Sequence, residues 1–167
     1  MKSPFSAWRY VSTVDLIDPA ELASQGVRLL LVDRDNTLVP RDTRTLPPQV
    51  CDWVRSVKDA GIAFCLLSNN FHTQQIAQTA AELGCQKVDH AMKPAPIAVW
   101  HAMAKMGVGA EQTVVVGDQV FTDLLAGTLS GVRTILVRPQ STTDLWYTQI
   151  FRIGERVVLG DVRFEGE

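Results

Sequence analysis

The chain has 167 residues, 46% of them hydrophobic, and a formal net charge of −2 at pH 7. This length and composition predict one globular domain, residues 1–167, that buries its core without disulfides or a structural metal. The charge argues against nucleic acid as a partner, and no apolar stretch reaches the ~20 residues that a transmembrane helix needs. Three separate cysteines (Cys51, Cys65 and Cys85) predict free thiols in a reducing compartment, which favours a cytoplasmic location.

The apolar pattern alternates between strands and helices along the chain. Short buried runs predict strands, whereas apolar residues three or four apart predict helices, several of which end at a glycine. The predicted strands are 27–32, 62–67, 87–91, 113–116 and 133–137, and the predicted helices are 19–24, 49–60, 72–83, 95–106 and 121–130. This order predicts an α/β, Rossmann-like fold with a five-stranded, mainly parallel sheet between helices. The core of the domain spans about residues 27–138, with an N-terminal extension (1–26) and a C-terminal segment (139–167).

Two acids follow the first predicted strand. Asp33 and Asp35 are separated by one residue, so in an extended chain their side chains point the same way at the carboxyl edge of the sheet. Neighbouring carboxylates repel each other unless one takes a proton or a divalent cation such as Mg²⁺ lies between them. Either arrangement suits catalysis, and a solvated acidic turn is the alternative.

Three further strands also end in polar signatures. These are Ser68-Asn69-Asn70, Lys93-Pro94 and Gly117-Asp118 with Asp123 five residues later. Taken singly, each signature has a structural explanation. Asn70 can cap the helix that follows it, Pro94 suits a first helical turn, and Asp118 and Asp123 suit the N-terminus of a helix through capping and the helix dipole. Together they supply what phosphoryl transfer requires: a carboxylate nucleophile, an acid or base, donors for phosphate oxygens, a cation and acids that hold a metal.

The order of these motifs resembles the haloacid dehalogenase (HAD) superfamily of aspartate-nucleophile phosphatases, from about Leu29 to Val137. Residues 33–39, 68–70 and 117–123, with Asp18-Pro19 upstream, are more narrowly similar to the YqeG-type branch of the class III-A phosphatases. Arg34 departs from the leucine often found there, and the cysteine-rich zinc loop of some class III-A members is missing.

The resemblance implies a role for each site residue. Asp33 is the nucleophile that becomes an aspartyl phosphate, and Asp35 is the general acid and base. Phosphate oxygens bind to residues Thr37, Ser68, Asn69 and Lys93. Mg²⁺ is the cofactor, held by Asp33, Asp118, the backbone carbonyl of Asp35 and, directly or through a neighbour, Asp123.

Two other classes of protein compete with a phosphatase. A receiver-like phospho-acceptor domain also gathers acids and a lysine at a sheet edge, but it places paired acids after the first strand and its phosphorylated aspartate after the third. An idle binding scaffold is the other class, and it needs none of the catalytic groups.

The sequence leaves no room for a cap domain, because only a loop, one helix and one strand fit between Thr37 and Ser68, and a helix and a strand between Ser68 and Lys93. An uncapped site is open to a large phosphorylated substrate. The loop 40–48 carries Arg41 and Arg44, which we expect either to contact phosphate or to lie in solvent.

The branch resembles phosphatidylglycerophosphate phosphatases, which makes a lipid phosphate the leading substrate, with a soluble sugar phosphate or a phosphoprotein as alternatives. Apolar residues near both ends (Trp8 and Tyr10; Leu145, Trp146, Ile150, Ile153 and Val157, with Arg152 and Arg156 between them) suit a location peripheral to a membrane. We nevertheless expect both segments to pack on the domain, since such stripes are more often core. The sequence leaves the oligomeric state open.

Overall fold

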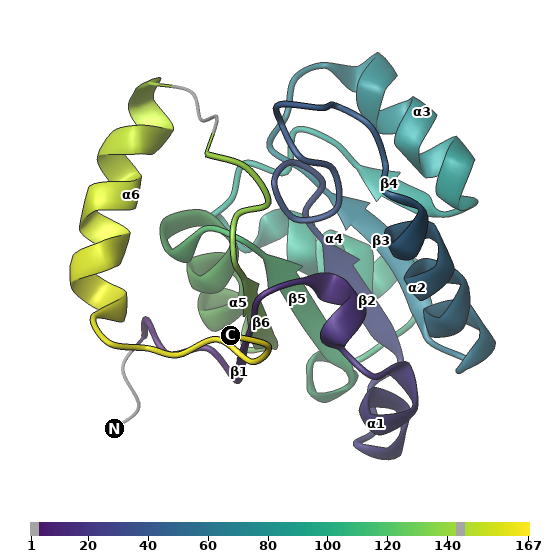
Figure 1. Cartoon of the computed structure of the whole chain (residues 1–167). Helices are drawn as coiled ribbons and strands as arrows, with labels where there is room; N and C mark the ends of the chain where they lie inside the picture. The colour runs from purple at the N-terminus through teal and green to yellow at the C-terminus, as the bar shows by residue number, and fades with distance from the viewer. Residues whose placement is uncertain (1–3, 143–145) are drawn as a thin grey trace.

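The computed structural model describes residues 4–142 and 146–167, and within them six parallel strands form one sheet between helices (Figure 1). The strands are β1 (Arg9–Val11), β2 (Leu29–Val32), β3 (Ala63–Leu67), β4 (Gln86–Val88), β5 (Thr113–Gly117) and β6 (Arg133–Val137). The α-helices are α1 (Pro19–Ser24), α2 (Pro48–Asp59), α3 (Thr73–Leu83), α4 (Ile97–Met106), α5 (Leu125–Ser130) and α6 (Trp146–Leu159). Two 3-10 turns, η1 (Val14–Leu16) and η2 (Ala110–Gln112), and a π-helical turn, η3 (Val120–Leu124), complete the fold. The predicted α/β, Rossmann-like fold is confirmed.

The strand order is β1-β6-β5-β2-β3-β4. The central strand β2 pairs with β5 on one side and β3 on the other, so that Val32 lies opposite Val116 and Leu66. The four motifs of the sequence analysis follow β2, β3, β4 and β5, which are contiguous in the sheet. All four therefore lie at one stretch of the carboxyl edge, where open α/β sheets bind ligands.

Alternating side chains of β2 build the two halves of the core. Leu30 and Val32 pack with buried residues of α1, α2 and α3, whereas Leu29 and Leu31 pack with those of α4 and α5. In α2 the buried residues Val50, Trp53, Val54 and Val57 form the stripe that its helical period predicts. Both faces of β2 are thus buried, as its continuous apolar run requires.

The prediction of five strands is one short. The N-terminal extension contributes β1, which pairs with β6 at the edge of the sheet and places Arg9 opposite Ile135. The strand has three residues and only Val11 is fully buried, so it lacks the alternating pattern by which longer strands are recognised. The predicted absence of a cap is confirmed: within residues 38–92 the structure has only loops, α2, α3, β3 and β4.

Helix α6 stands at one side of the sheet, next to η3 (Figure 1). The N-terminal segment packs on the domain as expected, with Tyr10 against Phe164 and Trp8 beneath Arg133. Helix α6 also packs on the domain, but not through the apolar stripe as expected: Arg152 and Glu155 face the domain, whereas Ile150, Ile153 and Val157 are 62%, 65% and 81% exposed. Leu145 and the side chain of Trp146, assigned to the same stripe, lie outside the described residues.

None of the helices in the described part of the chain is both long enough and apolar enough to cross a membrane.

Candidate active site

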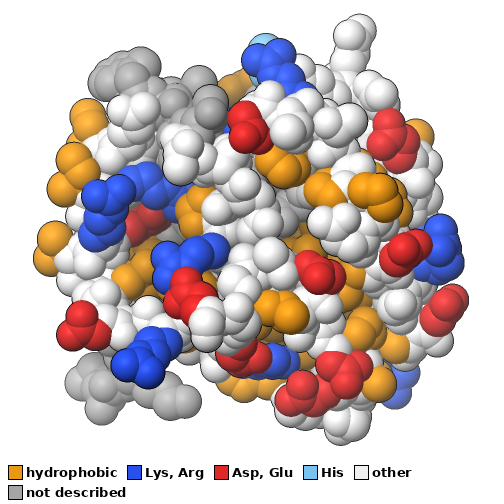
Figure 2. Space-filling view, in the orientation of Figure 1, with side chains coloured by type: hydrophobic (Ala, Val, Ile, Leu, Met, Phe, Trp, Pro, Cys, Tyr) orange, Lys and Arg blue, Asp and Glu red, His pale blue; other side chains and the backbone are white. Residues whose placement is uncertain are grey.

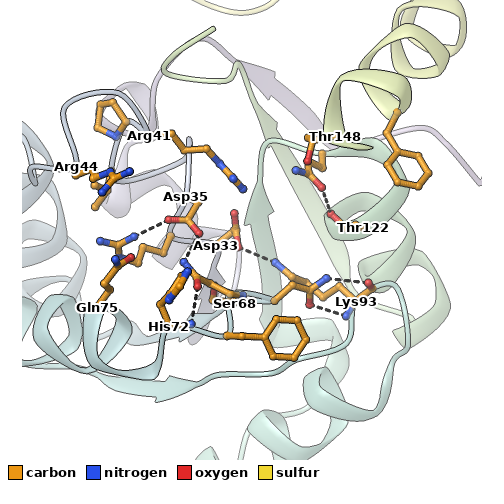
Figure 3. Close-up of a pocket in the computed structure, with 18 residues that line it drawn as sticks. Asp33, Asp35, Arg41, Arg44, Ser68, His72, Gln75, Lys93, Thr122 and Thr148 are labelled. Atoms are coloured by element: carbon orange, nitrogen blue, oxygen red, sulfur yellow. Dashed lines mark hydrogen bonds and ion pairs between the residues drawn. The ribbon is translucent and has the colours of Figure 1, made fainter. Parts of the chain in front are cut away.

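A cavity of about 790 Å³ opens at the carboxyl edge of the sheet (Figure 3). Its lining includes five of the predicted site residues: Asp33, Asp35, Ser68, Asn69 and Lys93. Thr37, Asp118 and Asp123 are almost fully buried and are not among the described residues that line it.

Three of the predicted acids converge. One carboxylate oxygen each of Asp33, Asp118 and Asp123 lies within 4.8 Å of the other two. Asp33 and Asp118 meet because they follow the paired strands β2 and β5. Asp123 comes from the π-helical turn η3, where a continuous α-helix was predicted, and π turns are common at functional sites. The carboxylate of Asp35 is not part of this group, and the metal contact expected of its backbone carbonyl stays a prediction.

Lys93 ties two of these acids together. Its Nζ donates to Asp33 Oδ1 at 2.8 Å, to Asp123 Oδ1 at 2.5 Å and to the carbonyl of Leu67 at 2.9 Å. Burial alone would lower the pKa of this amine, but Asp123 and Asp33 outweigh burial, and the pKa of Lys93 is raised. Lys93 is therefore a fixed cation at the floor of the site.

Asp118 is held by two donors. Thr37 Oγ1 donates to its Oδ1 at 3.2 Å, and the guanidinium of Arg152 forms an ion pair with its Oδ2. Burial raises the pKa of Asp118 to about 7, an effect that Arg152 opposes. Burial likewise raises the pKa of Asp33 well above its ordinary value, opposed by Lys93. Additional positive charge at this position would stabilise both carboxylates.

Both carboxylate oxygens of Asp35 accept a hydrogen bond from a neighbouring side chain. Arg34 Nη1 donates to Oδ1 at 2.5 Å, and Asn70 Nδ2 donates to Oδ2 at 2.9 Å. Arg34 is itself buried and donates from Nε to Thr79 at 2.8 Å. The residue that departs from the family pattern thus orients the Asp35 carboxylate beside Asp33.

Ser68 and Asn69 shape the loop after β3. Ser68 Oγ accepts from the backbone N–H of Asn70 at 3.1 Å. Asn69 bonds the backbone of Lys93 twice, accepting from its N–H at 2.7 Å and donating to its carbonyl at 2.9 Å. Asn69 therefore fixes the position of the lysine, and phosphate contacts by Thr37, Ser68, Asn69 and Lys93 stay predictions.

Helix α6 contributes residues that the sequence did not assign to the site. Arg152 donates to the backbone carbonyl of Asp118 at 2.8 Å as well as to its side chain, and Glu155 accepts from the backbone N–H of Val120 at 2.6 Å. Thr148 and Phe151 of the same helix line the cavity. The only signal for this in the sequence is an Arg and a Glu three residues apart, on the opposite side of the helix from the apolar stripe.

Comparison with known proteins agrees with the motifs. Residues 9–131 match the family of haloacid dehalogenase-like hydrolases. Over 166 residues, 99% of this chain and 96% of the relative, the sequence is 32% identical to the probable phosphatase YqeG of Bacillus subtilis (strain 168). It is 28% identical over 145 residues to phosphatidylglycerophosphate phosphatase 1 of Arabidopsis thaliana, covering 81% of this chain but 42% of that protein.

The fold is shared with solved structures of low sequence identity. The cobalt-bound deoxy-D-mannose-octulosonate 8-phosphate phosphatase of Haemophilus influenzae superposes with a TM-score of 0.55 over 81% of this chain and 88% of its own, at 16% identity. The family match and the 32% identity to YqeG confirm the resemblance to the superfamily and to its YqeG-type branch. The chain belongs to the haloacid dehalogenase-like hydrolase family, and within it to the phosphatases.

Proposed function

We propose that the protein is a Mg²⁺-dependent phosphomonoester hydrolase that works through an aspartyl phosphate on Asp33. The observation that carries this proposal is the position of Asp33, which faces the cavity, contacts Lys93 and has an oxygen within 4.8 Å of Asp118 and Asp123. A receiver-like signalling domain is set aside, because the chain belongs to a hydrolase family.

The acid group fits a divalent cation. Its three carboxylate oxygens are the hard ligands that Mg²⁺ prefers. Gly117 leaves the space into which the Asp123 carboxylate packs, since a Cβ there would lie 2.1 Å from Asp123 Cγ. Bound Mg²⁺ supplies the positive charge that offsets these carboxylates and the dianionic phosphate.

The chain's own groups can carry both chemical steps. A carboxylate oxygen of Asp33 bonds to phosphorus while the bond from phosphorus to the leaving oxygen breaks, and Asp35 gives that oxygen a proton. Asp35 then takes a proton from a water molecule, and the oxygen of that water attacks phosphorus. The bond between phosphorus and the Asp33 oxygen breaks, which releases inorganic phosphate and restores the Asp33 carboxylate. Arg34 and Asn70 hold Asp35 in place for both transfers.

The test is phosphate release from p-nitrophenyl phosphate with Mg²⁺ and with EDTA. Asp33→Asn should retain less than about a hundredth of the wild-type rate, because an amide does not attack phosphorus. Asp59→Asn, an exposed acid on α2, is the matched control and should keep full activity. Wild-type activity in the presence of EDTA contradicts the mechanism, and so does a rate above about a hundredth of the wild-type rate in pure Asp33→Asn protein.

We further propose a lipid phosphate, such as phosphatidylglycerophosphate, as the substrate. The supporting observation is the inverted orientation of α6: its charged side, Arg152 and Glu155, faces the protein, whereas Ile150, Ile153 and Val157 face outward. Figure 2 shows hydrophobic side chains in a row along the left edge, over α6, with basic side chains beside them. The relatives named for a lipid phosphate support the same choice.

A lipid surface fits this face better than a second copy of the chain. Helix α6 has 14 residues, so it is about 21 Å long and about 10 Å wide, and its outer face covers roughly 200 Å². Stable dimers bury about 800 Å² on each partner. An amphipathic helix that lies in the headgroup region needs only an apolar face with basic residues beside it, and Arg156 is exposed next to this one.

Vesicle flotation tests the lipid surface independently of catalysis. Wild-type protein should float with vesicles of phosphatidylcholine and phosphatidylglycerol, and Ile153→Asn/Val157→Asn should reduce the bound fraction at least about tenfold. The matched control is Ile97→Asn, which changes an apolar residue of α4 that is 69% exposed. Unchanged flotation of the double variant, or a wild-type dimer that the double variant converts to monomer, contradicts the lipid assignment.

A further inference from the structure

The acids of the active site already have cationic partners within the protein. Lys93 pairs with Asp33 and Asp123, Arg34 with Asp35, and Arg152 with Asp118. Two more cations, Arg41 and Arg44, line the same cavity, and within residues 4–142 and 146–167 neither forms an ion pair. The wall of the cavity therefore carries two cations that are not used in pairing with the four acids.

Arg41 lines the cavity and carries a buried donor that has no partner among the described residues. Its backbone N–H donates to Asn36 Oδ1 at 3.2 Å, which attaches the loop to the residue next to Asp35. Its Nε is buried and has no hydrogen-bond partner in the described structure. Because a buried donor without an acceptor costs free energy, such a group is expected to meet its acceptor on a ligand.

Arg44 is presented by a strained turn. Its φ is +56°, a left-handed conformation that is uncommon for a long side chain, and its N–H closes the turn onto the carbonyl of Pro40 at 2.9 Å. Figure 3 shows the side chains of Arg41 and Arg44 reaching from this loop to the cavity on the side of Asp33 and Asp35. One short turn thus brings two guanidinium groups to one wall.

We propose that Arg41 and Arg44 form a second anion subsite, which binds a further phosphate group carried by the substrate beside the phosphomonoester that is cleaved. The arginine fork matches phosphate oxygens with paired N–H donors. A cavity of about 790 Å³ has space for more than one phosphate. The inference rests on the proposed function for the identity of the cleaved group, but the subsite itself depends only on these two arginines.

The second phosphate can belong to a lipid diester or to a soluble bisphosphate, so the experiment uses matched pairs of ligands. The lipid pair is dihexanoyl phosphatidylglycerophosphate and dihexanoyl phosphatidic acid, and the soluble pair is fructose 1,6-bisphosphate and fructose 6-phosphate. Binding is measured by calorimetry on the Asp33→Asn protein, which cannot turn the ligands over. The added variants are Arg41→Ala and Arg44→Asn, the latter chosen because Asn tolerates positive φ.

Each variant should weaken the two-phosphate ligand of a pair by roughly 10- to 100-fold and the one-phosphate ligand by less than about threefold. Arg55→Ala, an exposed arginine on α2 that pairs only with Asp52 among the described residues, should leave both unchanged. Equal losses for both members of a pair, or no loss in Arg44→Asn, overturn the subsite. Within each pair, the loss of affinity for the two-phosphate ligand is compared with the loss for the one-phosphate ligand. The pair in which these losses differ more identifies the source of the second phosphate as lipid or soluble. Failure of the wild type to release phosphate refutes the hydrolase mechanism, whereas a remaining difference in binding still supports the subsite.

Discussion

Gly117, the last residue of β5, lies so close to Asp123 that a side chain there collides with the carboxylate. A Cβ built on Gly117 is 2.1 Å from Asp123 Cγ and 2.2 Å from its Oδ2, where ordinary contacts begin near 3.4 Å. In Gly117→Ala the carboxylate must therefore move by about 1.3 Å. This movement breaks its contacts with the amine of Lys93 at 2.5 Å and the N–H of Gln119 at 3.2 Å.

The expected loss of unfolding free energy has two parts. Forcing atoms into a packed site costs about 1–3 kcal/mol, and losing hydrogen bonds to a buried charge costs about 1.5–3 kcal/mol. We expect Gly117→Ala to lose about 2.5–6 kcal/mol in urea denaturation and to need more Mg²⁺ for activity. Gly131→Ala is the control: its φ is +76° and no heavy atom lies within 4 Å of a new Cβ, so it should cost only about 1–2 kcal/mol. If Gly117→Ala is as stable as this control, the packing argument is wrong.

Three further predictions address the metal, the general acid and α6. Burial raises the pKa of Asp118 from 3.8 to about 7. The contribution of this group to the stability of the folded protein is therefore complete below pH 4 and is lost as the pH rises through 7. The unfolding free energy of metal-free protein should fall by roughly 3 kcal/mol from this group between pH 5 and 8. The gain in melting temperature from Mg²⁺ over EDTA should therefore increase with pH; a gain that is constant or falls refutes this. Asp35→Asn should reduce hydrolysis of an alkyl phosphate by at least about tenfold more than that of p-nitrophenyl phosphate, whose leaving group needs no proton, and equal reductions would remove Asp35 from the role of acid. Arg152→Met should speed hydrogen exchange of the α6 amides while β2 and β5 stay protected, because it removes the bonds to Asp118; unchanged exchange means that α6 is held elsewhere.

The strands that carry the site could be predicted because each is a short apolar run that ends abruptly in polar residues. Leu29–Val32 is buried at every position, and the acid that follows it has nowhere to lie but the sheet edge. The sheet order then brought together residues from four separate motifs. By contrast, β1 has no such run, and only its pairing with β6 makes it a strand.

Hydrogen-bond partners were less predictable than residue positions. A motif gives the type of residue at a sheet edge but not the group that it contacts in the folded chain. Thr37 donates to Asp118, and Asn69 bonds the backbone of Lys93, although both were expected at the phosphate. Arg34 was noted only as a departure from the family pattern, and its guanidinium bonds both Asp35 and Thr79 of α3, which is 45 residues away.

The orientation of α6 shows why periodicity cannot decide which face of a helix is buried. The period separates an apolar face from a charged one, and area alone favours burying the apolar face. Here two polar groups beneath the helix, the Asp118 carboxylate and the N–H of Val120, would lose their partners if it turned over. Leaving a buried charge unpaired costs about 3–5 kcal/mol and leaving a buried N–H unpaired about 1–3 kcal/mol, a sum of about 4–8 kcal/mol. Burying the three exposed side chains Ile150, Ile153 and Val157 would gain a comparable ~4.5–9 kcal/mol. The polar contacts of the active site are therefore large enough to offset the apolar area, which is why Arg152 can lie inside while Ile150, Ile153 and Val157 stay exposed.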